Sequence, residues 1–443
     1  MSLFMPLKEE GLTSLKLRYD WKSDQTTVFA AKEWDSEFDF SRYNSDFYVE
    51  SLKSKDAKFF NDKETRELFG KYKQLDYLNS ILDLLRQGKH FGMDCYFSEK
   101  HNIRFMGNMH SRVKGVKNGY HATLSGGIRR HGFEDDERDV IIDGLNLSRA
   151  MSFKNVAADI DFGGCKTTVH MDELDLTNMD IMGFLAYSLD SIRAFTGPDM
   201  GFPIEMADVM RENFTTTFTG GPNGPLGSTG TPTSYGTYLA LKQAAKFMYG
   251  SESLDGKKIA IQGLGSVGWY MAEFILREDA ELFVYDLNEE VMDKLIQEFP
   301  TKKIVKVSKD DVLYHDVDIL CPCAIGGIFT EDNIPKLNCD IVFGPANNQL
   351  RASSRLEEEN LAKLMEDNNI LFQVAWWHNT AGVLCGHEEY VNQRAASEKN
   401  LYETIEKIVP TKTWENLNKA KKLGVTPTAC AYMTCEEAIY VRD

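Results

Sequence analysis

Three charged side chains in the middle of the sequence could carry out acid–base chemistry. Lys166 follows the Gly-Gly-Cys turn at 163–165, and burial at such a turn lowers the pKa of a lysine amine toward working pH. Lys154 lies 12 residues earlier, and a second cation would act in the same direction. Asp199, on the glycine- and proline-containing loop 196–201, could exchange protons with an amine. Taken alone, each residue is more often a surface charge than a catalyst.

A glycine-rich turn could hold the phosphates of a dinucleotide. Gly263, Gly265 and Gly268 follow the apolar run 258–262 and precede a predicted helix. The first glycine permits a tight turn, the second lets the backbone approach a pyrophosphate, and the third lets the helix pack close to the strand. Ser266 and Val267, within the turn, would direct their amides toward the phosphates.

An acidic residue downstream indicates which dinucleotide the turn would bind. Asp286 stands 18 residues after Gly268, at the end of the apolar run 282–286. A carboxylate there can accept both hydroxyls of the adenosine ribose and would repel a 2′-phosphate, so the motif favours NAD over NADP. We assign the neighbouring Leu287 to the same site. The alternative is that Asp286 is an ordinary cap at the end of a strand.

Length and composition limit the class of protein. A chain of 443 residues exceeds what one hydrophobic core usually organises, so two domains are expected. The net charge of −17 argues against a nucleic-acid partner, and no uncharged apolar run approaches the roughly 18 residues of a membrane span. Eight scattered cysteines and a start without an export signal indicate a reducing cytoplasm. No set of metal ligands is complete, Cys321 and Cys323 included, so no metal is expected.

The pattern of elements predicts an α/β protein of two domains. Short alternating stretches over 91–113 suggest a half-exposed sheet, with helices expected at about 134–151 and 180–194. The stretch 215–233 is dense in Gly, Pro, Ser and Thr and marks the domain boundary. The strand–turn–helix–strand at 258–286 begins a doubly wound Rossmann domain. We therefore predict an N-terminal extension packing on the substrate domain (1–88), an α/β substrate-binding and oligomerisation domain (89–225), a Rossmann NAD-binding domain (226–395), and C-terminal helices returning to the substrate domain (396–443).

The same motifs, in this order, resemble the amino acid dehydrogenases of the glutamate, leucine, phenylalanine and valine family. The likeness is greatest to the leucine and phenylalanine branch, and it runs with gaps from about residue 90 to the end. The segments that carry it are 125–129, 151–155, 163–166, 196–201, 233–236, 263–268, 322–327, 346–350 and 379–382.

The resemblance implies reversible oxidative deamination of an L-amino acid to a 2-oxo acid and ammonia. By motif, Lys154 would bind the substrate carboxylate, Lys166 would be the acid and base, and Asp199 would relay protons. Further substrate-binding positions would be Ser125, Gly126, Gly127, Met151, Gly197 and Asn379. The nicotinamide end of the cofactor would be lined by Thr233, Cys323, Ala324, Asn347 and Asn379.

Departures from the family pattern bear on the substrate. Ser125 stands where glutamate-specific relatives carry a lysine, and a dicarboxylate buried without a cation costs several kcal/mol, so an apolar or aromatic side chain is expected. Cys165 replaces a glycine beside Lys166 and could narrow the pocket, and Thr380 also departs from the pattern. Two alternatives remain open: a dehydrogenase of an atypical amino acid, and an NAD-binding protein without turnover. The family also implies a homo-oligomer.

Overall fold

The computed structural model describes residues 1–43, 56–111 and 121–441, which form two compact units. The main change from unit 1 to unit 2 falls between Gly227 and Ser228, inside the stretch expected to be the domain boundary. Unit 1 comprises 1–155, 161–227 and 388–396, and unit 2 comprises 156–160, 228–387 and 397–443.

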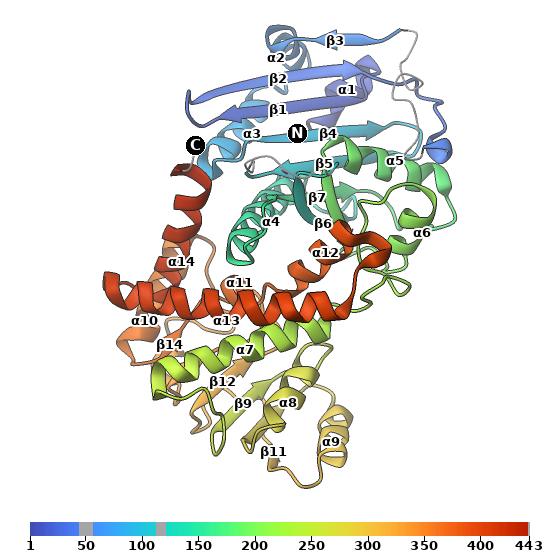
Figure 1. Ribbon diagram of the computed structural model, residues 1–443. Coiled ribbons are helices and arrows are strands. Elements are labelled where there is room, and N and C mark those ends of the chain that lie inside the picture. The colour runs from blue at the N-terminus through green and yellow to red at the C-terminus, as the bar shows by residue number, and fades with distance from the viewer. Residues whose placement is uncertain (44–55, 112–120, 442–443) are drawn as a thin grey trace. The chain divides into compact units, whose positions relative to one another are not determined.

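Unit 1 contains an eight-stranded mixed sheet in the order β3-β2-β1-β4-β5-β7-β6-β8 (Figure 1). The pairs from β3 to β7 are antiparallel, whereas β6 is parallel to both β7 and β8. The N-terminal segment, expected as an extension packing on the substrate domain, therefore adds three strands to this sheet. The strands are β1 (Ser14–Asp20), β2 (Gln25–Lys32), β3 (Lys58–Phe60), β4 (Gly92–Ser98), β5 (Ile103–Met109), β6 (Leu124–His131), β7 (Gly163–His170) and β8 (Ala194–Pro198).

Helices cover both faces of this sheet. One core joins Leu15 and Leu17 of β1 to Ile81 on α3 and Val140 on α4, and the other joins strands β5 and β7 to α5 around Phe184. The expectation of a half-exposed sheet over 91–113 was wrong in this respect, because β4 and β5 are almost entirely buried; residues 112 and 113 lie outside the described residues. The helices are α1 (Phe4–Glu10), η1 (Phe40–Arg42), α2 (Asp62–Lys71), α3 (Leu75–Gly88), α4 (Glu137–Ala157), α5 (Met179–Ser191) and α6 (Met206–Asn213).

Unit 2 is built on a six-stranded sheet in the order β11-β10-β9-β12-β13-β14, with every pair parallel. The strand order reverses direction between β9 and β12, which is the switch point where doubly wound sheets bind ligands. The strands are β9 (Lys258–Gln262), β10 (Glu281–Tyr285), β11 (Ile304–Lys306), β12 (Ile319–Pro322), β13 (Ile341–Val342) and β14 (Leu371–Phe372). This arrangement confirms the expected Rossmann-type fold.

The C-terminal helices belong to unit 2, so the expected return of 396–443 to the substrate domain was wrong. The long helix α13 runs beside α7 (Figure 1). Gly236 on α7 brings the two together: a Cβ there would lie 3.4 Å from Ile405 and 3.6 Å from Val409. The buried stripe of α13 thus finds its partner within unit 2. The helices of unit 2 are α7 (Gly230–Tyr249), α8 (Gly268–Leu276), α9 (Glu289–Glu298), η3 (Ile334–Lys336), α10 (Arg355–Asp367), α11 (Ala375–His378), α13 (Glu398–Leu423), α14 (Pro427–Glu436) and the π-helical η5 (Glu437–Val441). Helix α12 (Ala381–Asn392) begins in unit 2 and ends in unit 1, which also contains η4 (Gln393–Ala395).

Among the described residues, no helix combines the length and the apolar character needed to cross a membrane.

Candidate active site

Lys166 lies within β7, with its side chain almost wholly buried at 7% exposure. The register of the parallel pair β6 and β7 places Gly127 opposite Lys166. A Cβ at Gly127 would lie 2.8 Å from the Lys166 amine nitrogen. The glycine therefore leaves the space that the lysine side chain needs to reach across β6.

Asp199, directly after β8, is the ion-pair partner of Lys166. Its Oδ2 accepts from the Lys166 amine and, at 3.3 Å, from Arg129, while its Oδ1 accepts the Met200 amide at 2.8 Å. Burial acts to raise the pKa of Asp199, but the charges of Lys166 and Arg129 outweigh burial and lower it. The carboxylate is thus held ionised beside a buried amine.

Lys154 lies in the last turn of α4, half-buried and close enough to Lys166 for their charges to interact. Burial, followed by the positive charge of Lys166, lowers the pKa of Lys154 to about 8, although Asp199 opposes the shift. The two cations thus lie near one another, with the charge of Lys166 acting on Lys154. Lys154 is a cation near neutral pH that loses its charge in mildly alkaline solution.

Four other residues expected to bind substrate also lie in unit 1. Ser125 is fully buried, and its hydroxyl is engaged with the side-chain amide of Asn155 at 2.7 and 2.9 Å. Gly126 serves close packing of strands, because a Cβ there would lie 2.1 Å from the carbonyl oxygen of Cys165. Met151 is half-buried on α4, one turn before Lys154. A Cβ added at Gly197, on β8, would lie 3.0 Å from the carbonyl oxygen of Thr219.

Cys165 does not line the space around Lys166, and the expectation that it narrows the pocket was wrong. Successive side chains of a strand point to opposite faces. Cys165 is 1% exposed and belongs to the core on the α5 side. Gly164, like Lys166, faces α4, since a Cβ there would lie 2.2 Å from the amide nitrogen of Ser152.

The glycine turn of unit 2 has the geometry that a dinucleotide requires. Gly263 has a φ of 96°, which permits the tight turn. A Cβ at Gly268 would lie 2.0 Å from the carbonyl oxygen of Gly263, so only glycine lets α8 begin this close to β9. A Cβ at Gly265 would meet nothing within 4 Å, so the backbone here is open to close approach, as the second glycine of the motif requires. Ser266 and Val267, between them, precede the first residue of α8. These residues fit a dinucleotide.

Asp286 has the capping role considered for it, and its carboxylate is held beside the glycine turn. Its Oδ2 accepts the amide of Leu264 at 2.6 Å, and its Oδ1 accepts the amide of Asn288 at 2.8 Å, so it caps the strand end. The same contacts fix the carboxylate next to the glycine turn, at the carboxyl end of β10. Leu287, which follows it, is 85% exposed.

The residues expected at the nicotinamide end gather near the same turn. The side-chain amide of Asn379 donates to Asn347 Oδ1 at 2.8 Å and to the carbonyl of Pro345 at 3.0 Å. A Cβ on Gly263 would lie 2.6 Å from the Cβ of Ala324, and one on Gly268 would lie 3.0 Å from that of Cys323. Thr233 lies on α7, and a Cβ on Gly382 would come 3.0 Å from its hydroxyl. Asn379, expected to contact both substrate and cofactor, thus lies with the cofactor residues of unit 2.

Arg129 and Asp143 were not assigned a role from the sequence, although Arg129 belongs to a segment that carried the resemblance. Arg129 contacts both Asp199 and, at 3.0 Å, Asp143 on α4. The sequence did contain a signal for Arg129. It lies two residues after Gly127, so both lie on the same face of β6, the face that Lys166 approaches.

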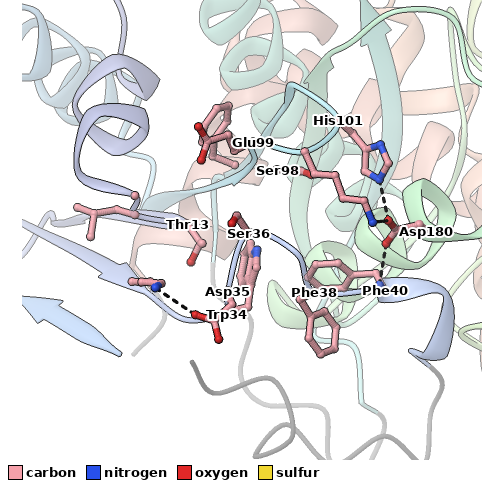
Figure 2. A pocket seen from close by; sticks show the side chains of 15 residues that line it. Thr13, Trp34, Asp35, Ser36, Phe38, Phe40, Ser98, Glu99, His101 and Asp180 are labelled. Carbon is pink, nitrogen blue, oxygen red and sulfur yellow. Dashed lines mark hydrogen bonds and ion pairs between the residues drawn. The ribbon is translucent and has the colours of Figure 1, made fainter. Parts of the chain in front are cut away.

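A cavity of about 140 Å³ lies elsewhere in unit 1 (Figure 2). Aromatic rings of Trp34 and Phe40 form part of its wall, and Asp180 binds Lys100 and His101 there at 2.6 and 2.8 Å. None of the residues expected from the sequence lines this cavity. Asp180 is paired with Lys100 and His101, and Lys32 with Asp35, so we assign the cavity no ligand.

Comparison with known proteins identifies two families of domains along the chain. Residues 110–214 match the family described as Glu/Leu/Phe/Val dehydrogenase, dimerisation domain. Residues 224–284 and 283–440 match the family described as Glutamate/Leucine/Phenylalanine/Valine dehydrogenase.

Individual relatives agree with these matches. The leucine dehydrogenase of Thermoactinomyces intermedius is 32% identical over 323 residues, covering 71% of this chain and 83% of that protein. The phenylalanine dehydrogenase of Lysinibacillus sphaericus is 32% identical over 321 residues, covering 71% and 81%. The crystal structure of L-tryptophan dehydrogenase from Nostoc punctiforme has the same fold, with a TM-score of 0.68 at 24% identity over 80% of this chain and 97% of that one.

The two matched domains, which include the parallel sheet with its glycine turn, place the chain among the amino acid dehydrogenases. The chain belongs to the Glu/Leu/Phe/Val dehydrogenase family, on the leucine and phenylalanine branch, which confirms the resemblance drawn from its motifs.

Proposed function

We propose that this protein is an NAD-dependent dehydrogenase that converts an L-amino acid with an apolar or aromatic side chain to its 2-oxo acid and ammonia, reversibly. The observation that carries the proposal is the buried ion pair of Lys166 and Asp199, with the half-buried cation of Lys154 next to it. Two amines and one carboxylate in one small region can bind a carboxylate and move protons at an adjacent amino group.

Each of the three residues would have its own part in the reaction. Lys154 binds the carboxylate of the substrate, because it is cationic below a pKa of about 8. Lys166 takes a proton from the attacking water and later returns it, so it alternates between charged and neutral forms. Asp199 accepts and returns protons at the substrate nitrogen.

The cofactor residues support NAD as the oxidant. When bound, NAD accepts the hydride that leaves the α-carbon of the amino acid. Gly263, Gly265 and Gly268 would hold the pyrophosphate at the start of α8, and Asp286 would bind the adenosine ribose. Thr233, Cys323, Ala324, Asn347 and Asn379 would surround the nicotinamide, with Ser266, Val267 and Leu287 along the rest of the cofactor.

We propose the type of substrate side chain from the residue at position 125. Ser125 supplies no positive charge, and its hydroxyl is engaged with Asn155, so a second substrate carboxylate would find no partner there. Leucine and phenylalanine dehydrogenases among the relatives support an apolar or aromatic substrate. The alternatives are an atypical amino acid and a protein that binds NAD without turnover.

A substrate panel tests this proposal. Amino acids with NAD or NADP, and 2-oxo acids with ammonia and NADH, are followed by absorbance of the reduced cofactor. We expect turnover with apolar or aromatic substrates, a preference for NAD, and loss of turnover in Lys166→Ala but not in Lys363→Ala, an exposed lysine on α10. Full activity in Lys166→Ala would overturn the mechanism, and no turnover with any amino acid would favour the binding protein.

We further propose a homo-oligomer in the cytoplasm whose only partners are the amino acid, the 2-oxo acid, ammonia and NAD. The match of 110–214 to a dimerisation domain supports assembly through unit 1. Eight free cysteines support a reducing compartment. Light scattering after gel filtration would reveal the assembly, and a monomer would contradict it.

A further inference from the structure

Arg129 is a second cation on the carboxylate that pairs with Lys166. Its guanidinium reaches Oδ2 of Asp199 at 3.3 Å, and this is the same oxygen that accepts from the Lys166 amine. Arg129 also donates to both oxygens of Asp143, at 3.0 and 3.2 Å. One guanidinium therefore bridges two carboxylates, only one of which contacts the lysine.

Asp143 continues this series of charges away from Lys166. Its Oδ2 lies 3.5 Å from Nε2 of His131, whose Nδ1 lies 2.9 Å from the exposed carboxylate of Asp135. The charged groups that face Arg129 and Asp199 are thus Asp143, Lys166 and Lys154, with His131 one step further out.

The proposed reaction creates a need that Arg129 can meet. When Lys166 gives up its proton, Asp199, whose side chain is only partly exposed, loses its nearest positive charge. A buried carboxylate without a cation takes up a proton, and a protonated Asp199 could not accept one from the substrate nitrogen. A guanidinium keeps its charge at every working pH, so Arg129 holds Asp199 ionised through this step.

We propose that Arg129 is a positioning residue that keeps Asp199 ionised and oriented when Lys166 is neutral, and that Asp143 limits how much of the Arg129 charge acts on the Asp199–Lys166 pair. This inference rests on the proposed function. It predicts opposite effects of two substitutions. Loss of the positive charge at 129 should make the Lys166 ammonium group harder to deprotonate, and loss of the negative charge at 143 should make it easier to deprotonate.

The direct test measures how readily Lys166 reacts as pH changes. The full-length protein and its variants R129Q, R129K and D143N are treated briefly with acetic anhydride, which acetylates only neutral amines. Peptide mass spectrometry then follows Lys166, with exposed Lys363 as the internal standard. We expect the midpoint of Lys166 labelling to move up by about one pH unit in R129Q, down in D143N, and to stay near that of the parent protein in R129K.

A role in packing alone would not give opposite shifts. An unmoved midpoint in R129Q, or shifts of the same sign in R129Q and D143N, would overturn the inference. Asp143 lies at a partly exposed position on α4. D143N therefore provides the test even if thermal melting shows that R129Q is not folded. In the amino acid assay, the pH at which kcat rises should shift with the labelling midpoint. Lack of turnover by the parent protein would overturn the proposed function, whereas turnover with unmoved midpoints would overturn only the role of Arg129.

Discussion

Two alanine substitutions in the glycine turn should separate binding of the dinucleotide from stability of the fold. A methyl group at Gly265 meets no atom within 4 Å, and this residue does not have a positive φ. Gly265→Ala should therefore leave the fold intact or stabilise it by up to about 1 kcal/mol through the unfolded chain. A methyl group at Gly268 would lie 2.0 Å from the carbonyl oxygen of Gly263. Because backbone must move to relieve that overlap, Gly268→Ala should destabilise unit 2 by about 1–3 kcal/mol.

The effects on NAD should follow a different order from the effects on stability. The methyl group added in Gly265→Ala would occupy the side from which the proposed pyrophosphate approaches. The substitution should therefore weaken NAD binding by at least about ten-fold, or about 1.4 kcal/mol. Calorimetric titration with NAD and thermal unfolding of the same samples measure the two quantities. Gly256→Ala, at another glycine of unit 2 with open space but a φ of 71°, should cost stability without affecting NAD. Unchanged NAD affinity in a stable Gly265→Ala protein would refute the placement of the phosphates.

Three further outcomes are expected. Because Lys154 loses its proton with a pKa of about 8, KM for the amino acid should rise above that pH, and Lys154→Gln should raise KM at pH 7 and remove this dependence in steady-state kinetics. Asp286→Asn should narrow the preference for NAD over NADP in paired titrations, because it removes the charge that repels a 2′-phosphate while retaining one acceptor for the amide bonds. Cys165→Ala should lower the free energy of unfolding by about 1 kcal/mol in a urea titration and leave the substrate panel unchanged, since this side chain lies in the core.

The functions of single glycines could be predicted from sequence because they depend on local geometry. The turn at Gly263, the close approach at Gly268 and the open position at Gly265 each follow from the absence of one Cβ. The face on which Cys165 lies could not be predicted in the same way. All eight residues of β7 are buried, so the strand shows no alternation of exposure that would separate its two faces.

Partners that come from distant parts of the chain were also beyond the sequence. The buried stripe of Leu401, Ile405 and Val409 predicts that α13 packs against something, but many apolar faces could serve as its partner. The same holds for β1, whose pairing with β2 on one side and β4 on the other depends on a register fixed by the whole sheet. The assignment of 396–443 failed for this reason, and the strands within the first 88 residues were not anticipated.

The surroundings of Lys166 lie between these two cases. Because side chains alternate along a strand, Gly127 and Arg129 lie on the same face of β6. The sequence alone therefore predicts that Arg129 lies next to the space left by Gly127. That the gap admits Lys166 depends on β6 lying parallel to β7 in one register, Ser125 opposite Gly164. A slip of one residue would put Arg129 on the opposite face and leave Asp199 with Lys166 alone. The charge balance of the site is therefore a property of the strand register, which explains why the pair could be proposed from motifs while its second cation could not.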